Sequence, residues 1–267
     1  MNMKFTLAVL LFGGNLFAQT PADSVTIQGT ATDFNGNPMD SCTVMWKSPS
    51  FRNVIQALTD SQGHYSARIP KGKYQSVAAC QMDVYLHTAK ADVSDEDRKL
   101  EFWAWDFIAD RDTTLNIRFH RMEVYGLRVF RVPGGMPTYQ IYVRPMSLTR
   151  LQRIMKQDFD ARNGENLSKI QLGTAQKDAK GIIMAPHADQ LKATVWIDGE
   201  EVPVLMKQEI KEYFGSNEYG NAYLLTVDRP KRTTNLPYRI FKVELEDMEY
   251  GERGEGLYYM EKDSYIK

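Results

Sequence analysis

The chain has 267 residues, and its 33 lysines and arginines nearly balance 34 aspartates and glutamates, which leaves a net charge of −1. This balance argues against a general nucleic-acid partner, because such proteins present a basic surface. Two cysteines are too few for a disulfide-dense scaffold or a four-cysteine zinc site.

Residues 1–18 predict a secretory signal peptide. Lys4 gives a positive start, an apolar run follows from Phe5 to Leu11, and cleavage after Ala18 leaves Gln19 as the new N-terminus. An uncleaved anchor is the alternative, but a membrane-spanning helix needs about 20 apolar residues, and a glycine pair interrupts this run. Since no cysteine lies near the cut, we expect an exported periplasmic or extracellular protein that is not a lipoprotein and has no transmembrane segment in its mature chain.

The hundred residues after the signal show short alternating apolar segments separated by turns. Alternation predicts half-buried strands, and the turn clusters contain glycine, proline and aspartate. Strands are expected at 25–31, 42–46, 53–59 and 65–69, with turns at 33–38, 60–63 and 70–73. Short strands at this spacing are typical of an antiparallel sandwich.

Three turn motifs in this region form a known pattern. They are Asp33, Gly36 and Pro38; then Thr59, Asp60, Gly63 and Tyr65; then Pro70, Gly72 and Tyr74. The stretch resembles the carboxypeptidase regulatory-like domain, a transthyretin-like β-sandwich, over roughly residues 24–120, although Asp40 replaces the family's usual small residue. The resemblance implies a generally non-catalytic domain of the kind attached to peptidases, outer-membrane receptors and surface proteins.

The second half, from residue 121, matches no family that we recognise. A helix is expected at 147–157, with Ser147 as its cap, followed by a long polar loop at 158–181. Alternation predicts strands at 123–132, 139–144, 191–197, 202–206, 222–227, 238–245 and 256–260, after one at 115–119 that ends the first half. Asp198-Gly199 between two alternating runs predicts a hairpin. The whole chain therefore predicts an all-β fold of two antiparallel β-sandwich domains in tandem, at 19–120 and 121–267, with one short helix and a long loop in the second.

The two cysteines, Cys42 and Cys80, both fall on core-facing positions of expected strands. An exported protein can keep a disulfide. Whether the two thiols are adjacent does not follow from alternation, so a disulfide and two separate buried thiols both stay open.

Aromatic residues are the most suggestive candidates for ligand binding. Trp103 and Trp105 share one face if residues 100–107 form a strand. They could stack against a sugar or anchor a partner, although aromatic side chains in two sandwiches more often pack in the core. We name them as candidate ligand-binding residues, with core packing as the alternative.

Catalytic and metal signals are weak throughout the chain. The four histidines show no metal-site spacing, and nucleophile-elbow, P-loop and dinucleotide motifs are missing. Residues 33–36 faintly resemble a calcium loop, but the following proline favours a turn. The acidic run from Glu244 to Glu255 could attract a cation, and we favour a solvated hairpin with guarding charges. We expect no catalytic residue, metal or cofactor.

These observations favour a non-catalytic exported protein that acts as a binding or assembly scaffold in the cell envelope. A carbohydrate-binding accessory protein of a glycan-uptake system is the first alternative, and an enzyme with an unrecognised site in the second domain is the other. The expected partner is an envelope protein or a glycan rather than a nucleic acid.

Overall fold

The computed structural model describes residues 23–89, 92–161, 184–215 and 218–262. The predicted signal peptide and most of the predicted loop at 158–181 lie outside these ranges. The all-β class is confirmed, with α1 (Leu148–Ala161) as the helix among the described residues. Among those residues, no helix has both the length and the apolar character that crossing a bilayer demands.

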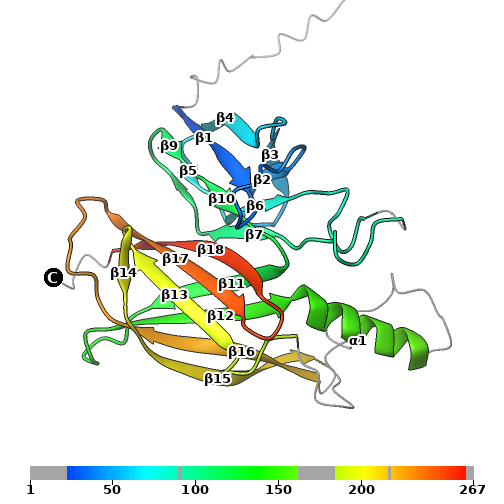
Figure 1. Cartoon of the computed structure of the whole chain (residues 1–267). Helices are drawn as coiled ribbons and strands as arrows, with labels where there is room; N and C mark the ends of the chain where they lie inside the picture. Colours follow the sequence, from blue (N-terminus) through cyan, green and yellow to red (C-terminus); the bar gives the residue numbers. More distant parts are fainter. Residues whose placement is uncertain (1–22, 90–91, 162–183, 216–217, 263–267) are drawn as a thin grey trace, which may run out of the picture.

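An eight-stranded sheet runs through the whole molecule (Figure 1). Its strand order is β14 (Glu200–Val202), β13 (Leu191–Ile197), β17 (Tyr238–Asp247), β18 (Glu252–Glu261), β7 (Phe102–Trp105), β6 (Ser76–Cys80), β2 (Thr43–Lys47) and β3 (Asn53–Leu58). The join between the two halves of the chain is the parallel pair β7–β18, in which Gly256 lies opposite Trp103 and Tyr258 opposite Trp105. The predicted boundary between residues 120 and 121 stays a prediction, and strands from both sides of it belong to one sheet.

Two smaller sheets cover opposite sides of this central sheet (Figure 1). One contains β1 (Ser24–Thr32), β4 (His64–Pro70), β9 (Thr113–Thr114) and β10 (Ile117–Arg118). The other runs β11 (Met122–Phe130), β12 (Tyr139–Ser147), β16 (Glu218–Val227) and β15 (Val204–Gly215), and β5 (Gly72–Lys73) pairs separately with β8 (Ile108–Ala109). The result is a three-layer arrangement with one core on each face of the central sheet.

Because side chains alternate along the central strands, each of these strands contributes residues to both cores. In β6, Val77 and Ala79 enter the first core, beneath β1 and β4, whereas Ala78 and Cys80 enter the second core, against β11 and β12. Every residue of β6 is buried. A strand that is buried on both faces reads as a continuous run of small and apolar residues, as Ser76–Cys80 does.

The turns form where the sequence indicated. The carboxylate of Asp60 accepts hydrogen bonds from the backbone amides of Gln62 and His64, both at 2.9 Å. Gly63 has a φ of +74°, and a Cβ there would lie 2.5 Å from the carbonyl oxygen of Ala31. Glycine is therefore required at this position both by backbone conformation and by close approach.

The predicted helix is confirmed, and its first turn is held by two side chains. The backbone amide of Arg150 donates to Ser147 Oγ at 3.5 Å, as expected of a cap. The amide of Thr149 donates to Glu252 Oε1 at 3.1 Å, so a carboxylate from β18 lies at the positive end of the helix. Leu148 and Leu151 are buried in a third, smaller apolar cluster.

The acidic run at 244–255 forms the predicted hairpin, β17–β18, but three of its carboxylates are buried instead of solvated. Asp247, Glu252 and Glu255 are buried, at 0%, 3% and 4% exposure. Each carboxylate meets an arginine from another element: Arg150 at 2.8 Å, Arg121 at 2.9 Å and Arg118 at 2.7 Å, respectively. The solvated interpretation was wrong because the hairpin lies in the middle of the central sheet, where arginines of neighbouring elements neutralise it.

Arg118 joins the two halves of the chain, and its loss should be costly. Arg118→Met leaves the buried Glu255 carboxylate without its guanidinium, which should lower the free energy of unfolding by about 3 kcal/mol. Arg118→Met/Glu255→Met should recover most of that loss, because position 255 then carries no charge and Glu244 keeps its ion pair with Arg253. Urea denaturation followed by circular dichroism measures both effects.

The matched control is Arg111→Met, since Arg111 pairs with Asp110 at the surface. This variant should change stability little. Equal losses in Arg118→Met and Arg111→Met would contradict the role of the Arg118–Glu255 pair.

Candidate functional site

Trp103 and Trp105 lie on one face of β7, as the alternation required, but they are not exposed. Their rings stack with centroids 4.9 Å apart, and Tyr125 of β11 stands edge-on to them at 5.6 and 5.4 Å. Trp103 is 7% exposed and Trp105 is 2% exposed. The rings therefore pack in the second core, and the structure does not support the expected ligand-binding role, because the neighbouring strand β11 covers the surface that a sugar would need.

A pair of glutamates lies beside this aromatic cluster. The Trp103 indole Nε1 donates to Glu123 Oε1 at 2.7 Å, and the Glu123 side chain is buried. Burial, together with the nearby Glu101, raises the pKa of Glu123 well above the ordinary range. Burial also raises the pKa of Glu101, against the opposing charge of Lys47 and a hydrogen bond from Tyr85. The pair therefore retains protons at pH values where exposed glutamates are ionised.

A second cluster of polar side chains comes from β12 and β15 and contains Tyr142, Arg144 and Glu212. Arg144 Nε donates to Glu212 Oε2 at 2.7 Å, Tyr142 donates to the same carboxylate, and the Arg144 guanidinium lies 5.3 Å from the ring centre of Tyr125. Burial opposes ionisation of Glu212, but the hydrogen bonds from Arg144 and Tyr142 outweigh it and lower its pKa. The pKa of Glu212 is thus lowered and that of Glu123 raised, although both lie near the same tyrosine, Tyr125.

A carboxyl group with a raised pKa can serve as a general acid. Glu123, however, is 4% exposed and its oxygen is occupied by an indole. The geometry therefore assigns the pair a structural role at the junction of β7 and β11. Alternation contains no signal for this pair, because Glu123 is the first residue of an expected strand and a charged first residue is usually solvated.

Cys42 and Cys80 are both free and buried. Thr43, not Cys42, lies opposite Cys80 in the β2–β6 pair. Successive residues of a strand point to opposite faces, so Cys42 enters the first core and Cys80 the second. The disulfide alternative is not realised, and burial raises the pKa of each thiol to about 12, which makes both unreactive.

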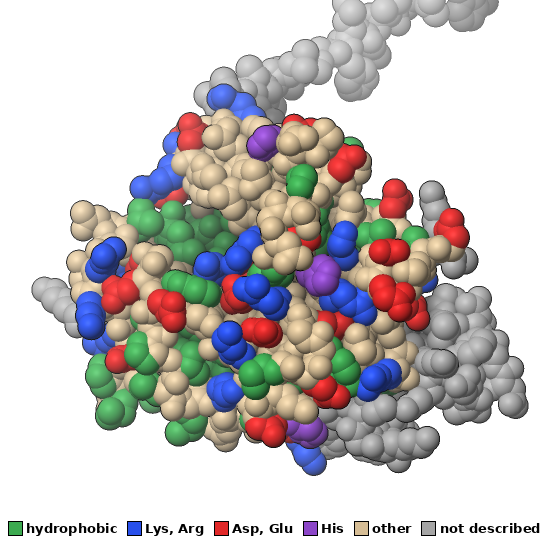
Figure 2. Space-filling model, in the orientation of Figure 1, with side chains coloured by type: hydrophobic (Ala, Val, Ile, Leu, Met, Phe, Trp, Pro, Cys, Tyr) green, Lys and Arg blue, Asp and Glu red, His purple; other side chains and the backbone are tan. Residues whose placement is uncertain are grey.

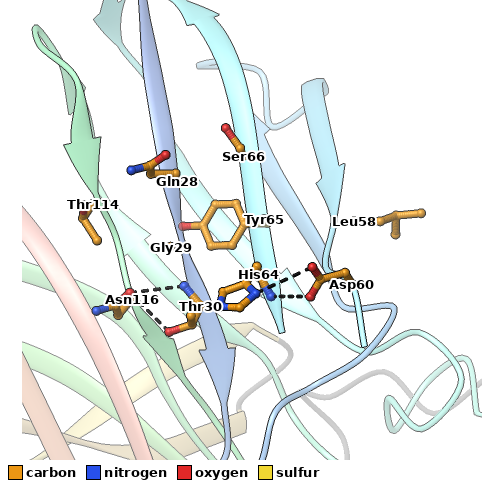
Figure 3. A pocket seen from close by; sticks show the side chains of 10 residues that line it. All are labelled: Gln28, Gly29, Thr30, Leu58, Asp60, His64, Tyr65, Ser66, Thr114 and Asn116. Carbon is orange, nitrogen blue, oxygen red and sulfur yellow. Dashed lines mark hydrogen bonds and ion pairs between the residues drawn. The ribbon is translucent and has the colours of Figure 1, made fainter. Parts of the chain in front are cut away.

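A shallow hollow of about 590 Å³ opens on the outer face of the β1–β4 sheet (Figure 3). It is lined mainly by amide, hydroxyl and imidazole groups: Gln28, Gly29, Thr30, Leu58, Asp60, His64, Tyr65, Ser66, Thr114 and Asn116. Figure 3 shows Gln28, Thr30 and Asn116 on one side of Tyr65, and Asp60 on the other. The hollow therefore presents open hydrogen-bonding groups that a ligand can reach.

Two pairs of contacts set the shape of this hollow. Asn116 Oδ1 accepts hydrogen bonds from the backbone amide and the hydroxyl of Thr30, at 3.2 and 3.3 Å. Asp60 Oδ2 lies 3.6 Å from His64 Nδ1. The Asn116 amide nitrogen consequently remains directed away from Thr30. The side chains of Gln28 and Ser66 make no hydrogen bond to any residue in the described ranges, so they are available to a ligand.

Another hollow, of about 550 Å³, lies beside the start of α1. Glu252 on its wall accepts hydrogen bonds from Arg121 Nε at 2.9 Å, Ser147 Oγ at 2.6 Å and Thr149 Oγ1 at 2.7 Å. The side chain of Arg121 in turn donates to the carbonyls of Asp95 and Glu96 at 2.6 and 3.0 Å. The central charges of this hollow, on Arg121 and Glu252, are paired with each other. We therefore assign these side chains a structural role and not a ligand-binding one.

No family model matches the chain, and no curated protein matches it. Among solved structures, the chain is similar to DUF3823 family proteins from Bacteroides ovatus (9% identity, 89% of this chain and 98% of that chain, TM-score 0.28) and Parabacteroides merdae (8%, 90% and 100%, 0.26). It is also similar to BcpA, the major pilin subunit of Bacillus cereus (11%, 90% and 69%, 0.25). These likenesses are too loose to assign a fold or a function, and the resemblance to the carboxypeptidase regulatory-like domain stays a prediction.

Glu123→Gln should change how stability depends on pH. The folded state of the wild-type protein keeps a proton on Glu123 that the unfolded chain releases, so its stability falls as pH rises from about 4.3 toward the raised pKa of the folded state. The glutamine keeps an oxygen for the Trp103 indole and removes this titration. Urea denaturation between pH 5 and 8 should therefore show a flatter profile for Glu123→Gln.

Glu123→Ala separates the two roles of this side chain. It removes the acceptor of the buried indole N–H, which should cost about 1–3 kcal/mol at every pH. Glu96→Gln, at an exposed glutamate, is the control and should follow the wild-type profile. If the free energies of unfolding of Glu123→Gln and the wild type differed by the same amount at every pH, the raised pKa of Glu123 would be contradicted.

Proposed function

We propose that the protein is an exported, non-catalytic binding and assembly component of the cell envelope. The observation that carries the proposal is the division of its polar groups: charges in the interior bind one another, whereas the open hollow is lined mainly by neutral hydrogen-bonding groups. A surface lined mainly by neutral hydrogen-bonding groups is suited to hold a partner.

Export rests on residues 1–18, whose positive start and apolar run match a secretory signal. The proposed location is periplasmic or extracellular. The proposed units at 19–120 and 121–267 would act as one body there, because the parallel pair β7–β18 joins their strands. A scaffold of this kind transmits a load through backbone hydrogen bonds instead of a flexible linker.

Carbohydrate binding is the second candidate function, and we assign it to the hollow because Trp103 and Trp105 are buried. Gln28, Ser66 and Asn116 direct amide and hydroxyl groups to solvent, and such groups match the hydroxyls of a sugar. Asp60 adds a carboxylate acceptor at the far side. An accessory protein of a glycan-uptake system would use such a surface.

We propose no enzymatic reaction for the chain. Within the ranges that the structure describes, the clustered acids are engaged by an indole, tyrosines and arginines. No His, Cys, Asp and Glu group of metal-binding size occurs in those ranges.

Crosslinking in intact cells tests the envelope role. The protein should be recovered in the envelope or medium, crosslinked to a partner. Leu7→Arg/Leu10→Arg interrupts the apolar run and should retain the uncleaved chain inside the cell, which controls for leakage. Recovery of the wild-type protein only in the cytoplasm, or only as uncrosslinked monomer, would contradict the proposal.

A glycan panel tests the carbohydrate alternative. Isothermal titration calorimetry should detect binding of at least one neutral oligosaccharide, and Gln28→Ala should weaken it roughly fivefold, in line with the ~1 kcal/mol of one hydrogen bond. Gln208→Ala, an exposed glutamine on β15, is the matched control and should bind as the wild type does. A panel without binding would remove this alternative and leave the assembly role intact.

A further inference from the structure

Large apolar side chains are exposed at one end of the sheet β11–β12–β16–β15. They come from the end of β11, from the turn between β11 and β12, and from the start of β15. We call them the apolar end, and they are Phe130, Val132, Met136, Leu205 and Met206, at 44%, 55%, 77%, 56% and 57% exposure. Single exposed apolar residues are common on proteins, but a group of them marks a contact surface.

The strand register brings these side chains together. Phe130 of β11 pairs with Gln140 of β12. Gln140 pairs with Thr226 of β16, which in turn pairs with Met206 of β15. Residues that pair across an antiparallel sheet lie on the same face, so Phe130 and Met206 share the outer face at the end from which the β11–β12 turn extends (Figure 1). Figure 2 shows hydrophobic side chains gathered at this end.

The turn between β11 and β12 is apolar at its tip and makes few demands on solvent. Residues 132–138, VPGGMPT, carry no charge, and Arg131 stands immediately before them. The two prolines have no amide hydrogen, and the amides of Gly135 and Thr138 donate to the carbonyls of Val132 and Met136 at 3.0 and 2.7 Å. Backbone groups that are bonded internally cost less to move out of water, so this tip is suited to enter hydrocarbon.

A basic loop, residues 228–236, borders the apolar end. The amide of Asp228 donates to the carbonyl of Pro203 at 3.0 Å, so the loop begins beside the start of β15. Arg229, Lys231 and Arg232 are exposed, and their side chains form no ion pair with any residue in the described ranges. Asp228 is the only acidic residue among these nine, which leaves the loop with a positive charge.

The acids next to this loop are engaged by its backbone. The two carboxylate oxygens of Glu200 accept hydrogen bonds from the amides of Lys231 and Arg232, each at 2.9 Å. Asp228 Oδ1 accepts from the amide of Arg229 at 2.7 Å. These bonds hold the loop in place, and the three basic side chains remain at the surface to meet an anion.

We propose that the apolar end docks on the surface of a membrane that contains anionic lipid, a contact beyond the assembly role proposed above. The β11–β12 turn enters the boundary of the hydrocarbon, while Arg131 and the basic loop meet the lipid phosphates. An uncharged apolar tip with cations behind it matches the order of layers in a bilayer, where phosphates lie outside hydrocarbon.

The same two features select lipid over the other occupants of such a surface. A neutral glycan has no anion for the basic loop. A second copy of the chain would bring an identical set of cations against the first, and like charges repel across an interface. An anionic lipid surface supplies both hydrocarbon for the turn and phosphates for the cations.

Sedimentation with lipid vesicles tests the proposal. The sample is the processed chain that begins at Gln19, because residues 1–18 contain an apolar run of their own and every described strand begins at or after Ser24. It should bind vesicles made of equal parts of phosphatidylglycerol and phosphatidylcholine. Binding to phosphatidylcholine alone should be about tenfold weaker or more, because the cations then lose their attraction to the surface.

Three variants separate the contributions of the turn and the loop. Met136→Ser should weaken binding to the mixed vesicles about tenfold, because the methionine side chain no longer enters hydrocarbon. Met248→Ser is the matched control and should bind as the wild type does, since Met248 is 52% exposed and lies just past the far end of β17. Arg229→Gln/Lys231→Gln/Arg232→Gln should remove most of the preference for anionic lipid. All three variants should unfold at the wild-type temperature.

Absence of wild-type binding to the mixed vesicles, or wild-type binding by Met136→Ser, would overturn the proposal. So would self-association without lipid that Met136→Ser abolishes, because a second copy would then occupy the apolar end. None of these results bears on glycan binding at the hollow or on crosslinking to an envelope partner, so failure here is distinct from failure of the proposed function.

Discussion

The parallel pairing of β7 with β18 is the contact on which the rest of the structure depends. Three residue pairs, from Gly256 opposite Trp103 to Tyr258 opposite Trp105, merge strands from both halves of the chain into one sheet. Because that sheet lies between two smaller ones, each of its central strands must supply apolar side chains to both faces. The small residues of β6 and the stacked tryptophans of β7 are both consequences of this position.

The same position explains why so much charge is buried. The β17–β18 hairpin brings Asp247, Glu252 and Glu255 into the middle of the molecule, where an unpaired carboxylate would be costly. Arg150 meets its carboxylate from the helix, Arg118 from β10 and Arg121 from the bend just before β11. Removing one partner of such a pair costs much free energy, because the other charge stays buried. The pairs therefore fix how the layers are placed on one another more than they add net stability.

Glu101 and Glu123 avoid a buried negative charge in a different way. The Trp103 indole donates a hydrogen bond to Glu123, and the nearby Glu101 adds a like charge. Protonation removes the charge, and a pH-dependent stability follows. The molecule thus combines an interior of paired or neutralised acids with an open hollow on β1–β4 that is lined mainly by neutral hydrogen-bonding groups.

Local sequence determined most of the secondary structure, because alternation and turn chemistry act over a few residues. The strands near Val25, the turn at Gly63, the Asp198-Gly199 hairpin and the helix capped by Ser147 all formed where they were predicted. The tertiary structure decided which of the candidate side chains are exposed. Trp103 and Trp105 are buried under β11, Cys42 and Cys80 lie in different cores, and arginines from distant segments pair with the acidic hairpin. Alternation predicts on which face of a strand a side chain lies. The residues that cover this face come from segments distant in the chain, and a single sequence has no local signal for such long-range packing.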